Sequence, residues 1–172
     1  MAQNLITHEP IDIPFRRQPR GSVKQITGKN VREFWLKPEA KRIADKQGCY
    51  VFALRAARGF RVWYVGKATK SFEQEAFAYH KLKHYNEVLF DGRKGTPVLF
   101  FIAPDGNKKK VPEDLCDEIE TFLIQAAYIE NPEIKNRQKA KIPAWTIAGV
   151  VRRSKGAISK KAQIFRTMMG LD

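Results

Sequence analysis

The chain has 172 residues, 43% of them hydrophobic and 11% aromatic, which suffices for the core of one domain and leaves little room for a second. Its 32 lysines and arginines outnumber 18 aspartates and glutamates, for a net charge of +14. No apolar run approaches the roughly 18 residues that cross a bilayer, and the N-terminal sequence has no apolar signal segment, so we expect a cytoplasmic protein without a membrane partner.

Residues 1–30 predict a basic N-terminal arm that stays flexible until it meets a partner. Pro10, Pro14, Pro19 and Gly21 interrupt any regular pattern of apolar residues. Arg16, Arg17 and Arg20 supply the positive charge. Residues 31–46 then predict a helix, in which Pro38 marks a first turn or a break because proline does not fit a helix interior.

Four stretches predict β-strands. Residues 49–54 and 60–66 are β-prone runs on either side of a turn that contains Gly59, an arrangement typical of a hairpin. The apolar run 98–103 suits a buried strand, and residues 143–151 predict a further one in the C-terminal part of the chain.

Three further helices are expected. Residues 71–89 predict a helix with Ser71 as its N-cap, and a last helix is expected between a cap at Ser159 and a stop at Gly170. Between them, residues 113–130 carry apolar side chains at helical spacing. The expected apolar face of this helix consists of Leu115, Ile119, Phe122, Leu123 and Ala126.

These elements together predict an α/β (α+β) fold, with a small mixed or antiparallel sheet of about three strands flanked by helices. We expect the core at residues 31–137 and a basic C-terminal extension, a strand followed by a helix, at residues 138–172. Cys49 and Cys116, the two cysteines, each lie in an apolar stretch, which predicts two buried thiols in a reducing compartment.

The positive charge is concentrated toward the C-terminus. From Arg137 onward the chain has nine cations and one acid, Asp172, so this stretch alone has a net charge of +8. A solvated surface usually mixes both signs, whereas a one-signed segment attracts a polyanion and releases counterions from its phosphates. The charge therefore predicts a nucleic acid as the partner. It does not distinguish DNA from RNA, of which we favour DNA. The expected contacts in this stretch are Arg152, Arg153, Lys155, Lys160 and Lys161.

The predicted hairpin carries tyrosine and glycine at the start of its first strand and at the end of its second strand. Gly48-Cys49-Tyr50 opens the first strand and Tyr64-Val65-Gly66 closes the second. These triplets resemble the signature of the GIY-YIG nuclease family. The elements after the hairpin also come in a similar order: a helix, a strand, a helix with Glu120 three residues before a Leu-Ile pair, and a proline followed by Asn136. The resemblance covers about residues 47–137.

The resemblance implies an endonuclease that hydrolyses phosphodiester bonds with Mg²⁺ or Mn²⁺. Tyr50 would be the general base, Tyr64 a ligand of phosphate or water, and Glu120 the metal ligand, while Asn136 would support the turn beside the site. Such chemistry requires a deprotonated oxygen nucleophile and a cation at the developing charge. A phenol becomes a useful base only when a cation lowers its pKa, and Mg²⁺ needs only one or two carboxylates. Glu118 is the alternative carboxylate.

One residue of the family pattern is missing. The family has an arginine on the first helix to hold the scissile phosphate, but here the corresponding positions are Glu75 or Ala76. The cations closest in sequence are Lys67, Lys70, His80 and Lys81. Lys67 is the favoured replacement, because its place directly after the second triplet is set by the end of a strand.

Two alternatives remain open from the sequence. The chain could be a non-catalytic nucleic-acid-binding module on the same fold, its cleavage lost with the arginine, and Tyr50 and Tyr64 would then be ordinary strand tyrosines. His80 and His84, at i and i+4, could share a zinc ion, but no third ligand is obvious on their helix. Specific cleavage of both strands of a duplex would favour a homodimer.

Overall fold

The computed structural model describes residues 4–18, 23–57, 59–140 and 158–171. The chain divides into two compact units, residues 1–140 and 141–172, and each is described by itself. In the described part of the chain, no helix combines the length and the apolar character needed to cross a membrane.

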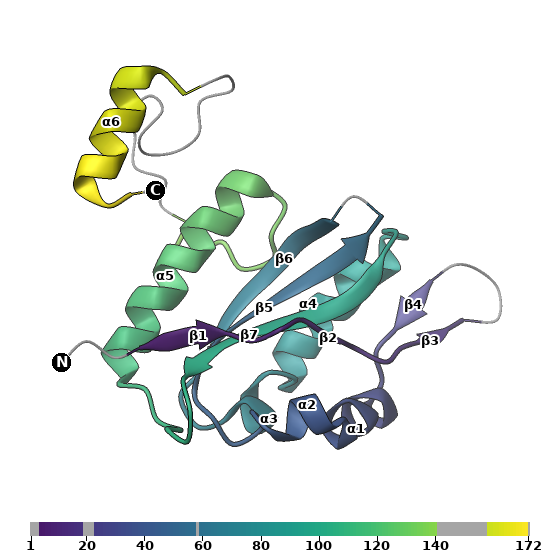
Figure 1. Cartoon of the computed structure of the whole chain (residues 1–172). Helices are drawn as coiled ribbons and strands as arrows, with labels where there is room; N and C mark the ends of the chain where they lie inside the picture. Colours follow the sequence, from purple (N-terminus) through teal and green to yellow (C-terminus); the bar gives the residue numbers. More distant parts are fainter. Residues whose placement is uncertain (1–3, 19–22, 58, 141–157, 172) are drawn as a thin grey trace. The chain divides into compact units, whose positions relative to one another are not determined.

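The first unit is built on an antiparallel sheet of five strands (Figure 1). The central strand β5 (Gly48–Ala56) pairs with β6 (Gly59–Ala68) on one side and with β7 (Thr96–Pro104) on the other. On the far side of β7 lie two short strands, β1 (Leu5–Thr7) and β2 (Ile11–Asp12). A separate ribbon is formed by β3 (Arg16–Arg17) and β4 (Lys24–Gln25).

The predicted α/β class with helices around an antiparallel sheet is confirmed, but the expected number of about three strands was wrong. The two additional strands come from the segment expected to form a flexible arm. Ile11 and Ile13 of that segment are buried, at 4% and 1% exposure. Pairing of β1 and β2 with β7 satisfies backbone groups that would otherwise form an open sheet edge.

Helices on one face of the sheet are shorter than the sequence predicts. Instead of one helix over 31–46 there are two, α1 (Gly28–Leu36) and α2 (Pro38–Lys41), with Pro38 as the first residue of the second helix. The stretch 71–89 contains α3 (Phe72–Glu75) and α4 (Tyr79–Phe90), and Ser71 caps α3 by accepting a hydrogen bond from the Gln74 amide. The chain bends between α3 and α4 because this places both Phe72 and Phe77 in the core.

The core lies in two layers, one on each face of the sheet. Tyr50, Phe52 and Leu54 of β5 pack with residues from α1, α3 and α4. On the opposite face, Val51 and Val65 pack against α5 (Glu113–Glu130). The alternation of side chains along a strand therefore assigns each residue of the hairpin to one layer or the other.

The orientation of α5 differs from the sequence prediction. Its buried residues are Cys116, Ile124 and Ala127, whereas Phe122 of the predicted apolar face is 67% exposed. A helix over 113–130 is confirmed, and its packed face shares Leu123 with the predicted set but otherwise differs from it. Two apolar stripes run along this helix, and periodicity alone does not tell which of them meets the sheet.

The second unit contributes α6 (Lys160–Met169) to the described residues. Its cap is confirmed, because the Ser159 hydroxyl accepts from the Ala162 amide. Gly170 ends the helix in the left-handed conformation, at φ 65°. The strand predicted over 143–151 lies outside the described residues.

Candidate active site

The two tyrosines of the hairpin lie on the same face of the sheet. Tyr50 of β5 is paired with Gly66 of β6, and Tyr64 is paired with Phe52, so the tyrosines are diagonal neighbours. Their rings are nearly parallel, at an interplanar angle of 17°, with centroids 6.5 Å apart. The predicted convergence of the two phenols on one face is therefore present in the structure.

Gly66 makes room for the Tyr50 phenol. A Cβ atom built on Gly66 would lie 2.5 Å from Tyr50 Oη and 2.6 Å from its Cζ, which is closer than real Cβ atoms come to such neighbours. The ring of Tyr50 thus lies directly over the backbone of the paired strand. Position 66 therefore requires glycine for a steric reason, because any side chain there would displace Tyr50.

Lys81 of α4 is a cation that lies against the Tyr50 ring. Its Nζ is 5.1 Å from the centroid of the Tyr50 ring, and it donates a hydrogen bond of 3.3 Å to the Lys67 carbonyl oxygen. Its side chain is 10% exposed. Burial lowers the pKa of Lys81, and the nearby charge of Glu75 opposes this shift in part. Lys81 therefore brings a largely desolvated charge to the hairpin.

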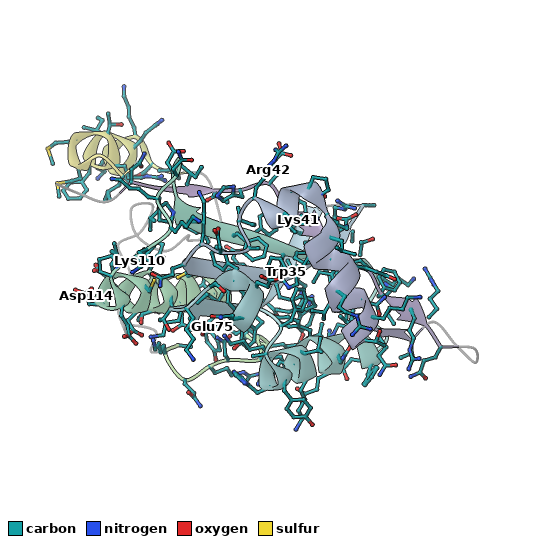
Figure 2. All side chains as sticks on the ribbon, turned by 90° about the horizontal axis from the view of Figure 1, so that it is seen from below. Trp35, Lys41, Arg42, Glu75, Lys110 and Asp114 are labelled. Carbon is teal, nitrogen blue, oxygen red and sulfur yellow. The ribbon has the colours of Figure 1, made fainter. Side chains whose placement is uncertain are left out.

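Glu75, one of the two residues that the family resemblance places at the missing arginine, anchors a loop (Figure 2). One oxygen accepts hydrogen bonds from the Thr69 amide at 2.7 Å and the Lys70 amide at 2.6 Å. The other oxygen lies 3.8 Å from Lys81 Nζ. The carboxylate thus holds the connection between β6 and α3, and it is partly neutralised by the lysine beside the tyrosines.

Lys67, the favoured replacement for the arginine, extends toward α5. Its Nζ is 2.9 Å from Asp117 Oδ2 and 3.7 Å from Glu113 Oε1. Odd-numbered residues at this end of β6 point to the α5 face, whereas Tyr64 and Gly66 face the other layer. The strand end does place Lys67, as expected, but it directs the side chain to the acids of α5.

Glu120 lies in an ion-pair network on α5. Its Oε2 is 2.7 Å from Lys139 Nζ, and the same ammonium is 2.6 Å from Asp117 Oδ1. The Glu120 side chain is 12% exposed. Burial first, and then the charge of Glu120, raises the pKa of Tyr64 to about 12. The acid therefore acts on the tyrosine electrostatically, although it comes from the helix on the opposite face.

Asn136, which the resemblance assigns to the turn beside the site, hydrogen-bonds to the backbone of β6. Its Oδ1 accepts from the Val65 amide at 3.3 Å, and its Nδ2 donates to the Val65 carbonyl. Asn131 Nδ2 donates to the Val62 carbonyl at 2.6 Å, and the Lys135 amide donates to the Trp63 carbonyl at 2.9 Å. The segment after α5 therefore occupies the outer edge of β6 and holds its position.

The remaining predicted contact residues are dispersed. His80 and Lys70 are exposed in the first unit, and Lys160 and Lys161 are exposed on α6. The predicted contacts Arg152, Arg153 and Lys155 lie outside the described residues.

His84 borders the site, which sequence reasoning did not predict. Its ring stacks on Tyr64, with centroids 5.7 Å apart, and its Nδ1 is 3.3 Å from Glu87 Oε2. The spacing of His80 and His84 suggested a zinc pair. Among the described residues, no group of three or more histidine, cysteine, aspartate or glutamate side chains is arranged to hold a metal ion.

Both phenols hold their protons near neutral pH. Tyr50 is 0% exposed, its hydroxyl has no hydrogen-bond partner within the described residues, and burial raises its pKa well above the ordinary value. Tyr64 is 7% exposed. In the resting protein each phenol therefore keeps its proton, and Tyr50 could act as a base only if a nearby cation favoured the phenolate.

Both thiols are buried, as the sequence predicts. Cys49 Sγ donates to the Cys116 carbonyl at 3.5 Å, and both cysteines are free. Burial raises the pKa of Cys49 from 9.0 to about 12, and that of Cys116 from 9.0 to about 11. Thiols held in the neutral form react slowly, since the thiolate is the nucleophile.

These raised pKa values predict a loss of stability in alkali. A buried acid whose folded pKa exceeds its unfolded pKa stabilises the fold fully below the unfolded value, here 9.0 for the thiols, and loses that contribution as pH rises toward about 12. We expect the free energy of unfolding, measured in urea, to fall above about pH 9. The fall should be shallower for Cys49→Ala than for the wild type. Equal slopes would show that the thiol does not contribute.

The donor set of Glu120 is compatible with a divalent cation. The carboxylates of Asp117 and Glu120, one helical turn apart, already hold a positive charge, the Lys139 ammonium, between them. Magnesium retains most of its waters and needs few protein ligands, so one carboxylate suffices. Glu120 is thus the residue that would hold the ion, provided that its ion pair with Lys139 breaks.

Sequence reasoning missed four residues of this arrangement: Glu75 as an anchor, Asp117, Lys139 and His84. The i, i+3 spacing of Asp117 and Glu120 was a usable signal for a shared cation. The sequence around Lys139 contains no pattern that predicted its position.

Comparisons of the chain with protein-family models, with curated proteins and with solved structures found no match.

Proposed function

We propose that this chain is a metal-dependent endonuclease that hydrolyses phosphodiester bonds in nucleic acid, with DNA favoured over RNA, on a GIY-YIG-like fold. One observation carries the proposal: Tyr50 and Tyr64 stack on one face of the hairpin with the Lys81 ammonium against the Tyr50 ring, and Glu120 is within electrostatic reach of Tyr64. Two phenols, a desolvated cation and a carboxylate are the groups that phosphodiester cleavage needs.

Each of these side chains has a distinct part in the proposal. Tyr64, which is slightly exposed, donates a hydrogen bond to a phosphate oxygen. Lys81 supplies the positive charge that the missing arginine would bring, and it favours the phenolate of Tyr50. Its low exposure strengthens both effects, because charges interact more strongly away from water.

Glu120 is the proposed ligand of Mg²⁺ or Mn²⁺. When bound, such an ion would stabilise charge that develops on the phosphate oxygens. Lys139 bridges Asp117 and Glu120 in the structure and would release Glu120 on loading. Its ammonium then remains near Asp117, where it can attract the phosphate backbone.

A second candidate is a nucleic-acid-binding module without cleavage. The observation that favours it is the burial of Tyr50, whose hydroxyl is closed off from solvent in the structure. In that case the phenol has a structural role, and the protein, with its net charge of +14, binds through contacts with the phosphate backbone of the nucleic acid.

Plasmid cleavage separates these candidates. We expect purified wild-type protein to nick supercoiled DNA in the presence of Mg²⁺ or Mn²⁺ but not of EDTA, and Glu120→Gln to lose this activity. Glu118→Gln is the matched control, since Glu118 is an exposed carboxylate two residues earlier on the same helix. Salt-sensitive binding without cleavage in any metal would support the binding module. Equal nicking by all three proteins would contradict the proposed site.

A further inference from the structure

The helix α5 has a second apolar stripe, distinct from its buried residues Cys116, Ile124 and Ala127. Along it the spacing alternates between four and three residues, the pattern of a coiled-coil seam. Phe122 is 67% exposed and Ile129 is 42% exposed. The residues of this face, which we call the α5 seam, are Leu115, Ile119, Phe122, Ala126 and Ile129. A solvated helix has no need of such a stripe, so the α5 seam is a candidate interface.

The charge around the α5 seam specifies the kind of partner. The helix contains six acidic residues and no lysine or arginine. Three of these acids, Glu113, Asp117 and Glu120, are paired with lysines of the same unit. Glu118 and Glu130 are exposed, and Asp114 lies in the first turn (Figure 2). Pairing of two α5 helices would bring these acids together, which is unfavourable. A helix with an apolar face and positive charge would be complementary.

The chain itself carries a helix of that description. One side of α6 presents Ile164, Phe165, Met168 and Met169, which are 62%, 41%, 68% and 55% exposed. The charged residues of α6 are all basic: Lys160, Lys161 and Arg166. Apolar side chains at i, i+1, i+4 and i+5 fall on one face, so α6 is amphipathic.

We propose that the α5 seam binds the α6 helix of a second copy of the chain. In a two-fold dimer each copy would offer one acidic seam and one basic helix, so that two identical contacts form and close the assembly. Burial of the exposed apolar side chains provides the attraction, and the opposite charges select this pairing over the pairing of like helices. The proposal is independent of the proposed nuclease function.

The test measures the mass of the full-length protein in solution by light scattering, over a wide range of concentrations. We expect the wild type to have the mass of two chains, and Phe122→Glu and Met168→Glu each to have the mass of one. Leu36→Glu is the matched control, because Leu36 is 66% exposed at the end of α1, outside both surfaces. Circular dichroism of each variant would confirm that it is folded.

A mixing experiment tests the pairing itself. Phe122→Glu has a damaged seam and an intact α6, and Met168→Glu has the reverse, so an equimolar mixture can form one intact contact. We expect the mixture, but neither variant alone, to contain dimers. A monomeric wild type, a dimeric Phe122→Glu, or a mixture that stays monomeric would each overturn the proposal.

Discussion

Replacement of Gly66 by alanine is expected to lower the free energy of unfolding by about 1–3 kcal/mol, the usual range for overpacking a filled core. The added Cβ would lie 2.5 Å from the hydroxyl of Tyr50, a side chain with 0% exposure. The ring must therefore move away from the β6 backbone. We also expect DNA cleavage to be lost, because the phenol leaves its place beside Lys81.

Gly28→Ala is the matched control for Gly66→Ala. Neither glycine has a positive φ, so backbone strain does not separate them, and a Cβ on Gly28 would meet no atom closer than 4.0 Å. Urea unfolding, followed by the fluorescence of buried Trp35 and Trp63, would give both values. Equal midpoints for the two variants would show that Tyr50 tolerates a side chain on the paired strand.

Lys81→Met is expected to reduce the rate of cleavage by about 100-fold or more while leaving the protein folded, as removal of one preorganised charge does in other active sites. Methionine keeps most of the volume of lysine but brings no charge to the tyrosines. The free energy of unfolding should not fall, because the substitution also removes the cost of burying an ammonium. Lys83→Met, an exposed position on the same helix, is the control.

The pH dependence gives Lys81 a second signature. Since burial lowers its pKa, this ammonium deprotonates at lower pH than an ordinary lysine. Cleavage by the wild type should therefore decline earlier on the alkaline side than that of an enzyme with an arginine in this place. The residual activity of Lys81→Met should lack this decline. An unchanged rate in Lys81→Met would assign the phosphate contact to another cation.

Much of the hairpin and of the site can be predicted from the sequence. The strands 49–54 and 60–66 and the helix 113–130 follow from residue type and periodicity, and the cap at Ser71 follows from local hydrogen bonding. The alternation of side chains along a strand also places Tyr50 and Tyr64 on one face. These features depend on interactions within a few residues or on one pair of strands.

The predictions that failed depend on contacts between distant segments. The strands β1 and β2 form because β7 offers an unpaired edge, not because residues 5–12 favour strands. The separation of α3 from α4 follows from packing Phe72 and Phe77 into one core. No local pattern contains that information.

The charged residues of the candidate site also divide into those that the sequence indicates and those that only tertiary packing brings together. The family resemblance singles out the two tyrosines, Gly66 and Glu120 as candidates, and strand pairing brings the tyrosines and Gly66 together. Packing across the sheet decides which lysine meets them: Lys67 is directed to the acids of α5, Lys81 is brought against Tyr50 from α4, and Lys139 bridges Asp117 and Glu120. Electrostatic partners are chosen by distance in space, and only the folded arrangement of the layers sets those distances.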